Sequence, residues 1–193
     1  PWRKACRPSA SVGRRLAMTR YVALLGSINV GGNRLKMAEL REALEREDFA
    51  DVETVVASGN VLFSHDERPS VGLAEKIAYI VKDRFGIDTF AVVRSRDELA
   101  AAIAGNPFAG ENEDKFVHTM FLTEPLDRTM FDDFAKAYEG PERLAAGTRE
   151  FFVDFGEGVA DSKLGQAMRH LKLRSTARNV RSLQRMLDKM DSN

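Results

Sequence analysis

The stretch GSINVGGN, residues 26–33, has the residue types of a loop that could hold a phosphate or another polar ligand. Its glycine spacing fits a Walker loop, G-x-x-x-x-G-K-[ST], in which a lysine reaches the phosphates and a hydroxyl holds magnesium. Gly32 and Asn33 stand at those two positions, which excludes an NTPase of this type. The dinucleotide fingerprint G-x-G-x-x-G does not match either. The alternative is a plain turn, because glycine adopts positive φ angles and asparagine tolerates them.

Hydrophobic periodicity predicts the elements around this loop. The expected strands are 20–25, 52–57, 60–64, 89–94, 115–122, 142–146, 149–154 and a short, poor one at 174–178. The expected helices are 36–47, 69–84, 97–104 with Ser95 as its cap, 127–138, 162–173 and a last one capped by Asn179. The order is β-α-β-β-α-β-α in each half, and residues 92–103 (VVRSRDELAAAI) align with residues 176–187 (TARNVRSLQRML).

We therefore predict an α+β protein with two tandem ferredoxin-like (β-α-β-β-α-β) halves, each followed by a short helix, packed as one compact unit. The first half is residues 18–106 and the second is residues 107–193. Residues 1–17 are basic and lack apolar periodicity, so we expect a disordered extension, with translation normally starting at Met18.

This topology gives the loop a set of neighbours. The first and third strands of such a half are antiparallel neighbours, so residues 26–33 and 58–60 are expected at one sheet edge, beside a helix start near Lys36. Free N–H groups at a helix start favour an anion or a polar ligand. The candidate ligand-binding residues are Asn29, Gly31, Gly32, Asn33, Ser58, Asn60, Lys163, Arg178 and Asn179. For Lys163 and Arg178 alone, the alternative is a solvated basic helix.

The charge is balanced overall but segregated along the chain. Residues 1–17 carry five basic residues and no acidic one, and residues 163–193 carry eight basic against two acidic residues. The basic ends could meet an anionic partner, or the C-terminal segment could pack on the acidic body of its own chain. The single cysteine, Cys6, fits a reducing cytoplasm, and no apolar stretch is long enough to cross a bilayer.

Other chemistry has little support in the sequence. The three histidines, His65, His118 and His170, are far apart and lack metal-binding spacing, so we expect no metal and no cofactor. An RNA-recognition strand needs stacking aromatics where Asn60 and Val61 stand. Nucleic-acid binding through residues 163–193 and an enzyme with an unrecognised site at the same loops remain the alternatives to binding of a small polar or anionic ligand.

Four motifs together resemble one known family: RYVALLGSINVGGNRLKMAELREAL, VVASGNVLFS, SKL and TARN. The chain resembles an uncharacterised bacterial family catalogued as domain of unknown function 1697. The resemblance implies a cytoplasmic α+β protein with two ferredoxin-like halves and no established activity. Gly26 and Ser27 stand where that family usually has arginine and glycine, and Val180 stands where it has an aromatic residue. Arg34 or Arg178 could supply the missing positive charge.

Overall fold

The first half of the chain forms one four-stranded sheet. The structure is a computed structural model and describes residues 18–28, 34–55, 59–66 and 70–192; the predicted extension at 1–17 lies outside these ranges. The strands are β1 (Met18–Gly26), β2 (Ala50–Thr54), β3 (Asn60–Asp66) and β4 (Phe90–Ser95), in the order β2-β3-β1-β4 with every neighbouring pair antiparallel. The helices are α1 (Met37–Glu45), α2 (Ser70–Phe85) and α3 (Arg96–Ala104).

The second half repeats this arrangement. Its strands are β5 (Val117–Leu122), β6 (Arg143–Ala146), β7 (Glu150–Asp154) and β8 (Ser175–Asn179), in the equivalent order β6-β7-β5-β8 and again antiparallel. The helical elements are α4 (Arg128–Ala137), α5 (Leu164–Ala167), the 3₁₀ turn η1 (Met168–Leu171) and α6 (Val180–Asp191). The predicted α+β class is thus confirmed, and the two halves are similar, as a duplication would make them.

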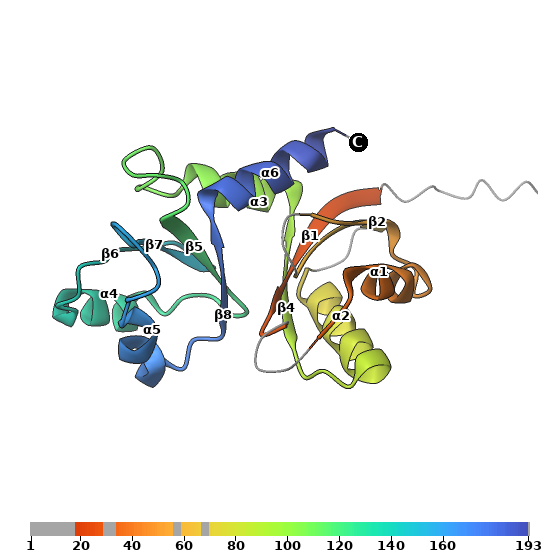
Figure 1. Cartoon of the computed structure of the whole chain (residues 1–193), viewed down its shortest axis with the longest axis horizontal. Helices are drawn as coiled ribbons and strands as arrows, with labels where there is room; N and C mark the ends of the chain where they lie inside the picture. Colours follow the sequence, from red (N-terminus) through yellow and green to blue (C-terminus); the bar gives the residue numbers. More distant parts are fainter. Residues whose placement is uncertain (1–17, 29–33, 56–58, 67–69, 193) are drawn as a thin grey trace, which may run out of the picture.

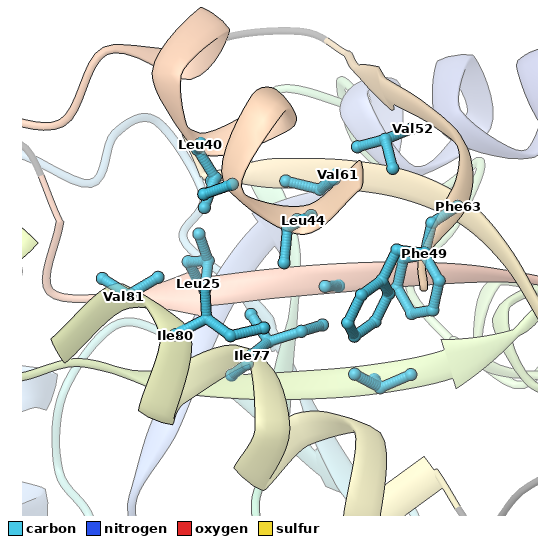
Figure 2. Close-up of a cluster of buried hydrophobic side chains, with 14 of the residues drawn as sticks. Leu25, Leu40, Leu44, Phe49, Val52, Val61, Phe63, Ile77, Ile80 and Val81 are labelled. Carbon is cyan, nitrogen blue, oxygen red and sulfur yellow. The ribbon is translucent and has the colours of Figure 1, made fainter. Parts of the chain in front are cut away.

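Each sheet packs its outer face on its own helices. In the first half, α1 and α2 bury Leu40, Leu44 and Ile77 against Leu25 and Phe63 of the sheet (Figure 2). Side chains alternate between the faces of a strand, so the neighbours Val22 and Leu24 point the other way. β1 is therefore apolar on both faces, which is why RYVALL reads as a continuous hydrophobic run.

The inner face of the first sheet meets the second half. Val22, Leu24 and Leu62 pack in one cluster with Phe121 of β5 and Leu183 of α6. Figure 1 shows the two sheets facing each other, with α3 and α6 side by side over the space between them. We call this contact region the seam; it is an apolar core shared by both halves.

Two predicted elements differ from the structure. The single helix expected at 162–173 is instead α5 followed by η1, which ends at Lys172 in a left-handed conformation (φ 52°). Gly165 lowers helix propensity there, and Lys163 offers no side-chain cap. The strand expected at 52–57 begins earlier, as Ala50–Thr54, with a register shift between Ala50 and Glu53 and a positive φ at Asp51; residues 56 and 57 lie outside the described ranges.

The predicted caps are confirmed. Ser95 and Glu98 form a capping box at the start of α3, and the Asn179 side chain accepts a hydrogen bond from the Ser182 N–H, 2.9 Å away, at the start of α6. Each cap is the final residue of the last strand of its half, so it fixes where that strand ends and where the seam helix begins.

Candidate functional site

Arg178 lies at the seam, beside the predicted ligand-binding edge. Its Nη2 donates to the backbone oxygens of Leu25 (3.2 Å) and Gly59 (3.1 Å), and its Nε donates to the Asn60 side-chain oxygen. Its Nη1 donates to Thr176 Oγ1 (2.8 Å) and to the Ala177 oxygen (2.7 Å). All five N–H groups of this guanidinium are therefore used within the protein. Arg178 lies on β8, so the solvated basic helix considered for it is wrong.

Arg94 makes the equivalent contact in the opposite direction. It lies on β4, and its Nη2 donates to the backbone oxygens of Leu122 (3.3 Å) and Arg149 (3.0 Å) in the second half. Leu25 N–H bonds Gly59 O in the first sheet, just as Leu122 N–H bonds Arg149 O in the second. In each half, one arginine thus binds the other half at the last backbone hydrogen bond between that half's first and third strands.

The two arginines differ in their surroundings. Burial lowers the pKa of both to about 10, so both remain charged at neutral pH. For Arg94, the neighbouring Arg149 lowers the pKa further, while Glu98 and Glu150 act to raise it. Glu150 is the first residue of β7, and Asn60 is the first residue of β3, so the two residues are equivalent in the two halves. The residue near Arg94 is therefore a carboxylate, whereas the residue near Arg178 is a neutral amide. Among the described residues, none forms an ion pair with Arg178.

The described part of the predicted edge is brought together. Asn60 is buried, Gly59 has φ +95°, and the Gly59 N–H lies 3.5 Å from the sulfur of Met37, the first residue of α1. Asn60 and the start of α1 therefore lie at one place, as the topology predicted, and Arg178 of the second half reaches the same place. Asn29, Gly31, Gly32, Asn33 and Ser58 lie outside the described residues.

Two other candidates have different roles. Asn179 caps α6 through its side chain, so its carbonyl oxygen is already engaged. Lys163 precedes α5 and lines a different cavity of about 930 Å³, together with Tyr138, Glu142 and Ser162. Figure 1 shows α5 on the far side of the second sheet from β1. Lys163 is therefore not a member of the group around Arg178.

Glu142 in that second cavity is a buried carboxylate that the sequence did not single out. It accepts hydrogen bonds from the Tyr138 hydroxyl (2.5 Å) and the Ser162 hydroxyl. Burial acts to raise the pKa of Glu142, but the Ser162 and Tyr138 hydroxyls, together with a backbone hydrogen bond, outweigh it and hold the pKa below its usual range. Burial and the bond to Glu142 raise the pKa of Tyr138 to about 12. A carboxylate with a low pKa is a poor base, so Glu142 is not a candidate for proton transfer. Its bonds to Tyr138, just after α4, and to Ser162, just before α5, instead link these two helices.

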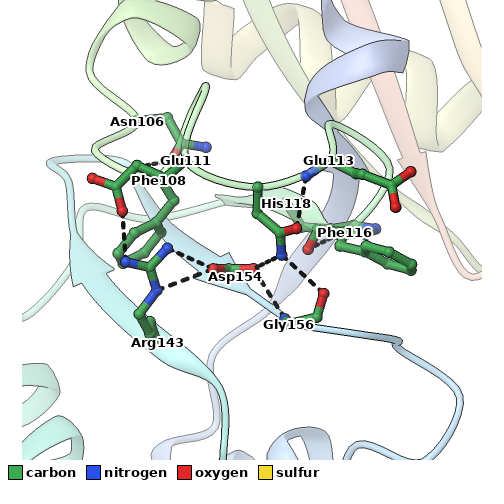
Figure 3. Close-up of polar contacts among 10 residues, drawn as sticks. Asn106, Phe108, Glu111, Glu113, Phe116, His118, Arg143, Asp154 and Gly156 are labelled. Atoms are coloured by element: carbon green, nitrogen blue, oxygen red, sulfur yellow. Dashed lines mark hydrogen bonds and ion pairs between the residues drawn. The ribbon is translucent and has the colours of Figure 1, made fainter.

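A second polar network closes the outer edge of the second sheet (Figure 3). Asp154 accepts from Asn112 Nδ2 (2.7 Å), Arg143 Nη2 (2.7 Å) and the Gly156 N–H (3.0 Å). Arg143 also pairs with Glu111 (2.6 Å). Both carboxylate oxygens of Asp154 accept hydrogen bonds from this chain. Because one of the donors is Asn112, the network holds the segment before β5 in place rather than an external ligand.

The unusual Gly26 has a steric explanation. A Cβ atom at this position would overlap the ring of Phe90, its partner across β1 and β4. Ser27, the next residue, has a positive φ of 55°. The ring of Phe90 therefore occupies the space that a side chain at 26 would need.

Within the described ranges, no group of three or more histidine, cysteine, aspartate or glutamate side chains is placed to hold a metal ion. Across the same ranges, no helix combines the length and the apolar character needed to cross a membrane.

Comparison with known proteins gives a family and a fold. A family model described as "Protein of unknown function (DUF1697)" matches residues 18–152. No curated protein matches the chain. A solved structure of the conserved bacterial protein SP0830 from Streptococcus pneumoniae is similar over 91% of this chain and 99% of that chain. The TM-score is 0.69 at 25% sequence identity.

Proposed function

Since the chain belongs to the DUF1697 family of proteins of unknown function, we propose a function from its own site: it binds a small polar or anionic ligand at the edge formed by residues 26–33 and 58–60. The observation that carries the proposal is the charge of Arg178. This guanidinium is largely removed from water and meets only neutral acceptors among the described residues. Charges act more strongly in such a low-dielectric region than in water.

Arg178 would attract the ligand by its charge rather than by hydrogen bonds to it. Its N–H groups already have acceptors, so the ligand's direct donors would come from the loop backbone and side chains around it. The start of α1, next to Gly59, adds the partial positive charge of a helix N-terminus. An anion at this edge would partly compensate the buried cation, which a neutral ligand could not do.

The test uses a charge change that keeps the shape of the site. Asn60→Asp replaces the neutral acceptor of Arg178 with a carboxylate of the same shape. The new negative charge offsets the positive charge of Arg178. Thermal-shift assays and calorimetry would compare inorganic phosphate, AMP, ribose 5-phosphate and ribose. We expect saturable stabilisation by at least one anion, with at least about tenfold weaker binding to Asn60→Asp.

Gln166→Glu on α5 is the matched control, because it adds one negative charge at an exposed position outside the seam. It should bind anions like the parent protein. Stabilisation by none of the anions, or equal binding by Asn60→Asp and the parent, would refute the proposal.

Nucleic-acid binding through residues 163–193 is the competing function. The dependence of affinity on salt concentration distinguishes it from binding of a small ligand. Affinity for a single-stranded oligonucleotide should then fall steeply as salt rises, and Arg181→Gln should reduce it. Two of the eight basic residues in this segment already have partners in the first half: Lys189 pairs with Glu53 (3.1 Å), and Arg178 bonds Asn60. An enzyme at the loop edge would in addition convert one of the bound anions, which product analysis of the same mixtures would reveal.

We also infer that both halves are ferredoxin-like and that the chain divides near residues 106 and 107. The strand order, with the third strand inserted between the first and second and every neighbour antiparallel, supports this inference. Separate expression of residues 107–193 would test the division.

A further inference from the structure

A smaller cavity, separate from the one beside Lys163 and Glu142, opens at the seam next to Arg94. It measures about 200 Å³ and is lined by α2 and β4 of the first half and by the ends of β5 and β8 of the second. This is smaller than the roughly 300–1,000 Å³ of sites for drug-sized ligands, so only a small molecule fits. It lies where the pseudo-symmetry of the halves places the counterpart of the Arg178 edge.

Buried polar groups beside this cavity are already satisfied. Arg94 is 2% exposed and is held by the Val93, Leu122 and Arg149 oxygens. Thr89 Oγ1 donates to the Gly26 oxygen at 2.5 Å. These groups shape the cavity, and a ligand must be recognised by other side chains.

Two arginines of the second half retain open donors. The guanidinium of Arg174 lies 4.7 Å from the ring centre of Phe90, and its N–H groups donate to no acceptor among the described residues. Stacking on a ring leaves the edge of a guanidinium free for bidentate bonds to a carboxylate or phosphate. The backbone of Arg174 is held by Thr123 N–H (3.2 Å). Arg149 uses Nη1 for Glu98 (3.1 Å) and Ser70 (3.5 Å), while its Nε and Nη2 have no partner in the described chain.

Two carboxylates line the same cavity. Glu75 is on α2 and Glu124 follows β5, and both are exposed. Neither forms an ion pair with any residue in the described ranges, although Arg174 lines the same small cavity. Opposite charges therefore share one cavity of this size without pairing with each other, and Val71, Ala74 and Ala78 supply an apolar wall beside them.

We propose that this cavity binds a small aliphatic zwitterion of the amino-acid type. Its carboxylate meets Arg174 and the open edge of Arg149, its ammonium group meets Glu75 and Glu124, and its short apolar part lies on Ala74 and Ala78. A simple anion would be opposed by the two glutamates, and a simple cation by the arginines. A molecule with both charges satisfies all of these side chains at once. This site is separate from the one at the Arg178 edge.

The test compares L-valine with two analogues that each lack one charge. Isovalerate lacks the ammonium group, and isobutylamine lacks the carboxylate. Titrations of the full chain would be followed by ¹H–¹⁵N NMR, in which the arginine Nε–Hε signals report on the cavity directly. We expect saturable binding of L-valine with shifts at Arg174, and at least about tenfold weaker binding of each analogue.

Single charge removals assign the two ends of the ligand. Arg174→Gln should weaken L-valine at least about tenfold without weakening isobutylamine, because it removes a positive charge that opposes the amine. Glu124→Gln should weaken L-valine without weakening isovalerate, because it removes a negative charge that opposes the carboxylate. Both side chains are exposed, so both variants should fold. Arg185→Gln, an exposed arginine on α6, is the control for Arg174→Gln. Asn60→Asp should not alter L-valine binding, which separates this site from the loop edge.

Three results with L-valine, its analogues and the arginine variants would overturn the proposal, and a fourth concerns its independence from the loop edge. The three are the absence of saturable L-valine binding, equal binding of isovalerate and L-valine, and equal effects of Arg174→Gln and Arg185→Gln. Loss of L-valine binding in Asn60→Asp would show that the second site is not independent, which also overturns it.

Discussion

Arg94 and Arg178 hold the two halves together by reciprocal contacts. Arg94 lies opposite Val22 of β1, and Arg178 lies opposite Thr119 of β5, which is the same register in the two sheets. Each guanidinium crosses the seam and binds two backbone oxygens at the far ends of the other half's first and third strands. The same arginine position thus serves both sheets, as expected when one half arose as a copy of the other.

Replacement of either arginine by lysine tests this relationship. Arg94→Lys and Arg178→Lys keep the charge but cannot bond two carbonyls with one planar group, so we expect each to lower the free energy of unfolding by about 2–3 kcal/mol. Urea unfolding at neutral pH measures the change. Arg185→Lys on the exposed side of α6 should change it by less than about 0.5 kcal/mol. Small effects at Arg94 and Arg178 would show that the apolar core alone holds the seam.

The sequence predicted the elements of this arrangement but not the contact itself. The alignment of residues 92–103 with 176–187 already places Arg94 opposite Arg178 as equivalents, and Ser95 and Asn179 as caps. Caps and strands depend on short-range pattern, so they can be read directly. Two of the acceptors of Arg178 are backbone oxygens 119 and 153 positions away, and backbone oxygens carry no sequence signal.

The same reasoning explains which parts of the site were found. Asn60 and Arg178 could be proposed separately, because one lies on the loop edge and the other in the TARN motif. Lys163 was grouped with them on charge alone, and the structure places it beside Glu142 instead. The cavity beside Arg94 depends on side chains of both halves, and no single stretch of sequence indicates it.

Asn60→Asp should also be detectable as a change in stability. The new carboxylate would accept from the charged Arg178 Nε as an ion pair, which adds the attraction between opposite charges to the hydrogen bond that Asn60 already accepts. We expect the free energy of unfolding at pH 7 to rise by about 1 kcal/mol and the gain to disappear as the pH falls and the new carboxylate is protonated. Asn60→Leu, which removes the acceptor at similar size, should instead destabilise. Equal unfolding free energies for Asn60→Asp and Asn60→Leu would contradict the described geometry.

Gly26→Ala should destabilise the first half through Phe90. A methyl group at position 26 overlaps the Phe90 ring, and overpacking of this kind costs about 1–3 kcal/mol. The double variant Gly26→Ala/Phe90→Ala removes the overlap, so its loss should be smaller than the sum of the two single losses. Thermal unfolding of the four proteins measures the coupling. Additive losses would mean that the ring is not what excludes a side chain at 26.

Glu142 should make the fold sensitive to acid. Its pKa is held below the usual range in the folded chain, so its contribution to stability is full above the unfolded pKa and is lost as the pH falls through the folded one. Glu142→Gln leaves one of the two hydroxyl donors, Tyr138 or Ser162, without a carboxylate oxygen, and should cost about 1–3 kcal/mol at pH 7. The difference between the parent and Glu142→Gln should shrink toward zero at low pH. Urea unfolding at pH 7 and at pH 3 measures both values, with Glu139→Gln at an exposed neighbouring position as the control. A difference that stays constant between the two pH values would show that the ionised form of Glu142 is not what the two hydroxyls stabilise.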